Sequence, residues 1–176
     1  MKEAGLSQSD VEIVNLQHAD GRTALIRGDV AAWSGLDPHM ASAELTDNAK
    51  IIHRNIDFNT FGTLNVREEF AQKYPDYVKK VVLAYERARR WILDNPDEAA
   101  KILAEVGKID LAVAKRQITE RTVLNKDVGA PNDALRAALQ AVVPILTEEK
   151  LVAADKDPGK ALTELIDASL AEAALK

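Results

Sequence analysis

Few side chains in this sequence are suited to chemistry, and their spacing matches none of the common catalytic or metal-binding patterns. The three histidines, His18, His39 and His53, have neither an i,i+4 spacing nor an HExxH motif. The chain has no cysteine, which excludes disulfides, thiolate catalysis and cysteine-based metal centres. The GxSxG nucleophile motif and the glycine-rich phosphate loops are also absent. We therefore expect no metal, no cofactor and no enzymatic activity.

The composition and the net charge limit the kinds of molecule that the chain could bind. The chain has 176 residues, of which 47% are hydrophobic and 29% charged, and this balance favours a folded globular domain. Its formal net charge of −5 argues against nucleic acid, because phosphate binding requires a basic surface. One helix segment is rich in cations, and we expect these to form a solvated face: Lys79, Lys80, Arg87, Arg89 and Arg90.

The first third of the chain has the pattern of an α/β fold. Short runs rich in β-branched or apolar residues predict strands over Val11–Leu16, Val30–Trp33, Lys50–Arg54 and Phe58–Leu64. A helix is predicted between the first two strands, over Asp20–Arg27 and closed by Gly28. Another is expected from Asp37 and Pro38, as N-cap and first helical residue, to about Leu45.

The remainder of the chain predicts helices alone. Their expected ranges are Val66–Lys73, Pro75–Leu93, Pro96–Gly107, Asp110–Val123, a longer helix starting at Asn132 or Asp133, and Leu162–Ala174. Pro144 is expected to kink the longer helix or end its first part, because proline removes a backbone hydrogen bond.

The most distinctive segment is Ala24–His39, which places Trp33 at the end of a predicted strand. In open α/β sheets, ligands bind outside the carboxyl ends of the strands, where Trp33 and the following loop would lie. Each residue also has a structural interpretation. Trp33 could be a partly buried strand-end aromatic, Asp37 a plain helix N-cap, and His39 a surface residue in the first turn.

This segment resembles the "A-L-x-x-G-x-V-D-A-W-x-x-W-D-P" region of the periplasmic substrate-binding proteins of ABC importers. The group that binds aliphatic sulfonates, taurine and nitrate is the most similar. The resemblance continues through Asn65–Asp76 ("R-x-F-x-x-x-x-P-x") and Ala88–Ala100 ("A-x-x-W-x-x-x-N-P-x-E-A-A"). Two positions depart from the pattern, because Ala31 replaces the aspartate and Leu36 replaces the second tryptophan.

The resemblance implies a fold and a set of site residues. The fold would be part of a type II periplasmic-binding-protein fold, in the α/β class, with a short parallel-type sheet followed by a helical C-terminal part. Residues 1–57 would belong to the second lobe, 58–65 would form a crossover or hinge strand, and 66–176 would return to the first lobe. The ligand-binding residues would be Trp33, Asp37, His39, Asn59 and Thr60, although Asn59 and Thr60 could equally bond a turn or a strand ladder.

The implied function is capture of a small anionic solute of the alkanesulfonate, taurine or nitrate class. The solute would be delivered to the membrane permease of an ABC transporter, by closure of two lobes about a hinge. The chain resembles only about the second half of such proteins and has no signal peptide. It would therefore be periplasmic by resemblance, and cytoplasmic if the sequence is complete. Two alternatives remain. One is a truncated half that binds no ligand and self-associates as a homodimer or swapped dimer. The other is a thiamine-pyrimidine-related enzyme or sensor that reuses the fold.

Overall fold

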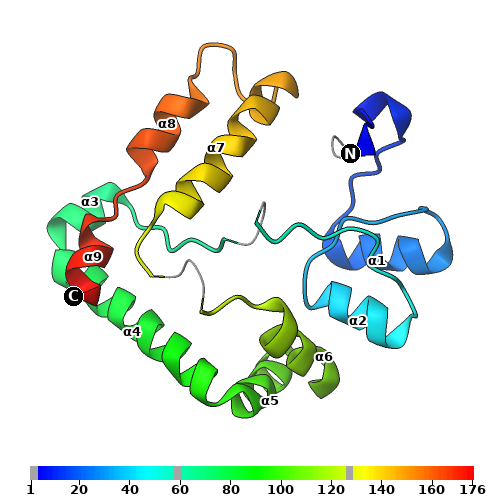
Figure 1. Cartoon of the computed structure of the whole chain (residues 1–176), viewed down its shortest axis with the longest axis horizontal. Helices are drawn as coiled ribbons and strands as arrows, with labels where there is room; N and C mark the ends of the chain where they lie inside the picture. The colour runs from blue at the N-terminus through cyan, green and yellow to red at the C-terminus, as the bar shows by residue number, and fades with distance from the viewer. Residues whose placement is uncertain (1–3, 58–60, 126–128) are drawn as a thin grey trace. The chain divides into compact units, whose positions relative to one another are not determined.

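A computed structural model describes residues 4–57, 61–125 and 129–176 of the chain (Figure 1). Its elements in chain order are η2 (Gln8–Asp10), α1 (His18–Arg27), α2 (His39–Thr46), α3 (Glu68–Lys73), α4 (Pro75–Asp94), α5 (Pro96–Gly107), α6 (Leu111–Arg116), the π-helical turn η3 (Gln117–Arg121), α7 (Asp133–Glu148), α8 (Pro158–Leu165) and α9 (Ser169–Leu175). They divide into two compact units, one of Met1–Ile51 with Ala100–Arg121 and the other of Ile52–Ala99 with Thr122–Lys176.

The predicted α/β class with a short parallel sheet is wrong. Across 4–57, 61–125 and 129–176 the structure contains helices and turns and no strand. The predicted strands Val11–Leu16, Val30–Trp33 and Lys50–Arg54 lie in irregular or extended chain without a ladder partner. The same holds for positions 61–64 of Phe58–Leu64, whose first three residues lie outside the described ones. The physical reason is that a strand needs a neighbour for its N–H and C=O groups, and an alternating apolar pattern does not supply one.

These irregular segments leave apolar side chains in solvent. Ile13 is 60% exposed and Ile52 is 86% exposed, and Val11, Val14, Leu16 and Ile51 are exposed as well. In a paired sheet, such side chains would be covered by helices or by another sheet. The alternating pattern is therefore present in the sequence, while the burial that it predicts is not realised in the described residues.

The helix predictions fared better because their signals are local. Helix α4 spans Pro75–Asp94, against a predicted Pro75–Leu93. Gly28 ends α1 in the left-handed region, at φ 79°, as a C-cap glycine does. Side-chain caps are present at two predicted starts: Asp110 accepts from the Ala112 N–H at 2.7 Å, and Asn132 accepts from the Leu135 N–H at 3.0 Å.

Two helix predictions in the second half of the chain need correction. The predicted Leu162–Ala174 helix is two helices, α8 and α9, separated at Ile166–Ala168. Asp167 lies at this break, and its carboxylate accepts the N–H of Ser169, the first residue of α9, at 2.8 Å. The helix capped by Asp110 changes to the π-helical turn η3 after Arg116. Helix α7 continues through Pro144 to Glu148, so Pro144 does not end it, and the alternative that Pro144 kinks the helix stays a prediction.

The first unit is built around small side chains. Helix α1 packs on α2, and α2 packs on α6. The buried apolar residues of this unit among those described are Ala24, Ala41, Ala43, Ala100, Val113 and Ala114. Two sets of ion pairs link its helices. Arg22 of α1 binds Asp47, which follows α2, and Glu44 of α2 is paired with Arg121 and, at 3.9 Å, with Arg116.

The second unit is organised by α4. Figure 1 shows α9 beside α4 and α8 beside α7, in agreement with their contacts. Its buried apolar residues among those described are Val78, Ala99, Leu135 and Ala174. Arg89 of α4 donates to the carbonyl of Leu124 at 2.5 Å, which fastens the chain after η3 to α4. None of the described helices combines the length and the apolar character needed to cross a membrane.

Candidate functional site

Trp33 lies in the irregular chain between α1 and α2, and its side chain is half-buried. The indole lies against two glycines of the first unit. A Cβ atom added at Gly21, in α1, would be 2.4 Å from the indole Nε1, and one added at Gly35 would be 2.4 Å from Cη2 at the opposite end of the ring. The ring is therefore neither sealed in a core nor fully in solvent.

Asp37 and His39 lie at the start of α2 and are both half-buried. Asp37 accepts a hydrogen bond from the Ala41 N–H at 2.9 Å, so its carboxylate serves the first turn of the helix. The N-cap residue of α2 is Pro38, one residue later than predicted, with His39 as the first helical residue. Asp37 therefore bonds to the first turn of α2 from the position before the cap, and a ligand-binding role for Asp37 or His39 stays a prediction.

Two predicted site residues, Asn59 and Thr60, lie outside the described residues. Their assignment to a hinge near the ligand therefore stays a prediction, and so does the assignment of 1–57, 58–65 and 66–176 to lobes and hinge. The structure places Trp33, Asp37 and His39 in the same unit, between the end of α1 and the first turn of α2.

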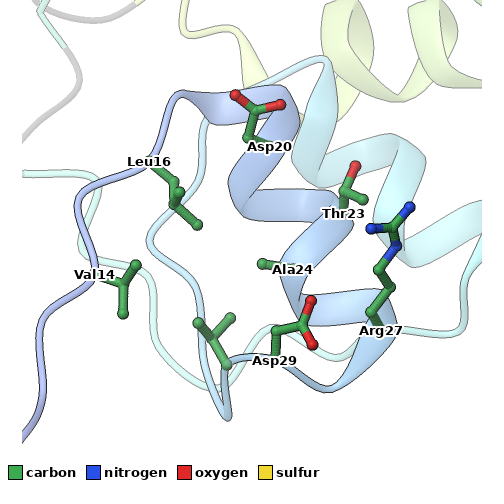
Figure 2. Close-up of a pocket in the computed structure, with 8 residues that line it drawn as sticks. Val14, Leu16, Asp20, Thr23, Ala24, Arg27 and Asp29 are labelled. Carbon is green, nitrogen blue, oxygen red and sulfur yellow. The ribbon is translucent and has the colours of Figure 1, made fainter.

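An open groove lies along α1 and was not predicted from the sequence (Figure 2). Its volume is about 320 Å³, and it is lined by Val14, Leu16, Asp20, Thr23, Ala24, Arg27, Asp29 and Val30. Four of these residues lie on one face of α1, at spacings of three and four residues. After Gly28 the chain turns back, and the Asp29 N–H donates to the Ala24 carbonyl at 2.9 Å, which brings Asp29 and Val30 to the same groove.

The groove combines an apolar floor with a charged rim. Val14, Leu16, Ala24 and Val30 supply the apolar surface, and Arg27 is the only cation among the lining residues. Figure 2 shows Arg27, Asp20 and Asp29 spread around the groove. Within the described part of the chain, these three side chains take part in no ion pair. Arg27 is thus available to bind an anion, while the two carboxylates oppose it.

A second groove of about 330 Å³ lies in the other unit, between α7 and α8. It is lined by Arg136, Ala137, Gln140, Leu162 and Thr163. Arg136 is already engaged, because its Nη2 donates to the Ile166 carbonyl at 3.5 Å. Thr163 donates to the Gly159 carbonyl at 3.1 Å within its own helix. This groove therefore offers an anion fewer uncommitted groups than the α1 groove.

The cationic segment of α4 is only partly the solvated face that the sequence predicts. Glu86 accepts hydrogen bonds from Arg89 at 2.7 Å and from Arg90 at 2.6 Å, and Arg89 is 23% exposed. These bonds from Arg89, and then from Arg90, lower the pKa of Glu86 to about 2. The pair is a structural link in the second unit. Among the residues described, no group of three or more histidine, aspartate and glutamate side chains could hold a metal ion.

Comparison with known proteins finds two relatives that share the same name. Two curated relatives carry the provisional name of aliphatic sulfonates-binding protein. The one from Bacillus subtilis (strain 168) is 28% identical over 119 residues, 66% of this chain and 36% of the relative. The one from Escherichia coli (strain K12) is 24% identical over 154 residues, 86% of this chain and 47% of the relative. The chain thus spans about a third to a half of the length of these relatives.

No solved structure matches the chain significantly. The family described as NMT1/THI5 like matches residues 1–99, more than half of the chain, and this range includes the Trp33 segment and the α1 groove. The chain therefore belongs to the NMT1/THI5-like family.

Proposed function

We propose that this chain is part of a solute-binding protein that captures a small anionic solute, an aliphatic sulfonate, and delivers it to the permease of an ABC importer. The observation that carries the proposal is the family match over residues 1–99 together with the names of the two relatives. The names describe binding proteins and no reaction, so the proposed role is non-covalent capture, in the periplasm.

The chemistry of the first unit supports binding of such a solute. A sulfonate has an anionic head, which a guanidinium can bind through two parallel hydrogen bonds, and an alkyl tail, which packs on aromatic or aliphatic surface. Trp33 offers a half-buried indole, and Arg27 offers a cation above an apolar floor. We propose Trp33 as a wall for the alkyl tail, and Arg27 as the candidate for the head group.

Isothermal titration calorimetry of the whole chain with 1-butanesulfonate, taurine and nitrate tests this proposal. Binding of a sulfonate, with loss of heat in Trp33→Ala and no loss in Trp91→Ala, is the expected result. Trp91 is a suitable control because it lies on α4, in the other unit, with 42% of its surface exposed. Arg27→Gln identifies the head-group site, since its heat decreases only if the groove holds the anion.

A chain that is folded by circular dichroism and yields no heat with any of the three solutes would overturn the proposal. It would instead favour a part of a binding protein that does not bind on its own. Turnover of a pyrimidine substrate would favour the enzyme alternative.

A further inference from the structure

Gly21 occupies a position in α1 where glycine is not needed for the backbone. It is the fourth of the ten residues of α1 (His18–Arg27), in helical conformation, and it is buried. Glycine in a helix interior is less favourable than alanine, because it loses more conformational freedom on folding. The positive φ values of the described glycines are at Gly5, Gly28 and Gly129, so Gly21 does not belong to that group. The reason for a glycine here must be space.

The space above Gly21 is taken by one edge of Trp33. A Cβ at Gly21 would lie 2.4 Å from Nε1 and 2.6 Å from Cδ1 of the indole, closer than non-bonded atoms can approach. Any side chain at this position would therefore have to displace the pyrrole edge of the ring.

The opposite edge of the same indole ring lies against Gly35. A Cβ there would lie 2.4 Å from Cη2, 2.6 Å from Cζ2 and 2.7 Å from Cζ3. Gly35 also has no positive φ, so its backbone conformation is open to other residues. Two glycines, 14 positions apart in the sequence, thus provide room for the two ends of one indole.

We propose that Gly21 and Gly35 are positioning residues for Trp33, and that together they hold the indole in the one orientation in which it meets a bound solute. The inference rests on the proposed function, in which Trp33 packs on the alkyl tail. An aromatic wall that is ordered before binding loses little freedom when the solute arrives, and this raises affinity. A ring held by backbone on both edges keeps its orientation without needing a hydrogen bond to Nε1.

The test uses single-tryptophan protein, with Trp91→Phe, so that fluorescence and the indole N–H resonance report on Trp33 alone. We expect Gly21→Ala and Gly35→Ala each to shift the Nε1–H resonance and the emission maximum, and to weaken sulfonate binding roughly tenfold or more. Gly107→Ala is the matched control in the same unit, because a Cβ at Gly107, the last residue of α5, would come no closer than 3.6 Å to its nearest neighbour, an ordinary contact. It should change neither signal.

A second measurement separates positioning from simple loss of stability. In a Trp33→Ala background the obstacle is gone, so Gly21→Ala should raise the melting temperature, since alanine favours the helix. With Trp33 present, the same change should lower it. An unchanged indole resonance in both glycine variants, or equal destabilisation by Gly21→Ala with and without Trp33, would overturn the inference.

The two proposals fail in different ways. If the parent protein binds no sulfonate while the resonance and melting temperatures change as expected, then the proposed function fails and the glycines position Trp33 for some other contact. If the parent protein binds sulfonate and both glycine variants bind it equally well, then the positioning inference fails and the proposed function stands.

Discussion

Arg22 and Asp47 join the first two helices of the chain. The Nε atom of Arg22, in α1, donates a hydrogen bond to Oδ2 of Asp47 at 2.9 Å. The Nη2 atom of Arg22 donates to the same oxygen and also to the hydroxyl of Thr46, the latter at 2.9 Å. The two side chains are 26% and 19% exposed, so the pair is shielded from much of the solvent. The buried apolar residues of α1 and α2 are Ala24, Ala41 and Ala43, which bury little apolar surface, so the ion pair adds a polar link to a small apolar contact.

Removing this link should destabilise the first unit. We expect Arg22→Gln or Asp47→Asn to lower the free energy of unfolding by about 1–2 kcal/mol, as is usual for hydrogen bonds to charged groups. Urea denaturation followed by circular dichroism measures the change. Arg27→Gln serves as control on the same helix, because Arg27 makes no ion pair within the described residues. An equal loss in Arg27→Gln would mean that helix charge, and not the pair, is responsible.

Glu86 should make the second unit sensitive to acid. Hydrogen bonds from Arg89 and then Arg90 lower its pKa to about 2 from an ordinary value of 4.5. A carboxylate with a lower pKa in the folded state contributes stability that is complete above the unfolded value and is lost as pH falls. We therefore expect the melting temperature to fall as pH decreases from about 5 towards 2.

The matched pair of variants for this prediction is Glu86→Gln and Glu69→Gln. Glu86→Gln should flatten the decrease of melting temperature between pH 5 and 2, since the titrating group is gone. Glu69→Gln removes one carboxylate from an exposed pair with Arg67, and it controls for the change in net charge. Identical pH profiles for the parent and Glu86→Gln proteins would contradict the assignment to Glu86.

Asp110 should contribute to stability as the cap of α6. Its carboxylate satisfies the Ala112 N–H at 2.7 Å, one of the amides that a helix start leaves without a partner. We expect Asp110→Ala to lower the free energy of unfolding by about 1 kcal/mol and Asp110→Ser to retain most of it. Thermal denaturation of the parent, Asp110→Ala and Asp110→Ser proteins measures the loss of stability. If serine is as damaging as alanine, then the cap is not the cause.

The exposed apolar side chains on irregular chain should promote self-association. Ile13 and Ile52 are 60% and 86% exposed on segments that form no helix and no strand ladder within the described residues, and extended segments of this kind can add to one another as strands. We expect size-exclusion chromatography with light scattering to show dimers or larger species that increase with concentration. Ile13→Lys and Ile52→Lys should reduce them.

Leu165 provides the control for association. It is 75% exposed but ends helix α8, where the backbone bonds within its own helix. Leu165→Lys removes comparable apolar surface and should leave association unchanged if the extended, non-helical chain is the cause. A protein that stays monomeric at high concentration would remove the basis of this prediction.

Local signals made most helices predictable from the sequence. Pro75, Asp110 and Asn132 mark helix starts within one residue, because a cap or a first-turn proline acts on its nearest neighbours. The signal at Asp167 is local as well, because its carboxylate accepts the N–H of Ser169, two residues later. The apolar periodicity across Leu162–Ala174 nevertheless predicts one continuous helix, so the break was not predicted.

The sheet and the groove could not be predicted in the same way. A strand depends on a partner elsewhere in the chain, and the pattern of Val11–Leu16 contains no information about whether one exists. The α1 groove requires Val14 and Leu16 to lie beside α1, which the helix periodicity does not determine. The seating of Trp33 on Gly21 joins residues twelve positions apart, and only the folded unit places them together.

The irregular chain over Lys50–Arg54 also affects how the protein is cleaved. Endoproteases bind their substrates as extended strands, so a helical site must unfold first whereas an irregular one can be bound directly. Lys50 and Arg54 are exposed and carry the side chains after which trypsin cuts. Brief digestion should therefore nick the chain here before it nicks Lys79 or Arg87 within α4, and would leave a fragment that ends shortly after α2.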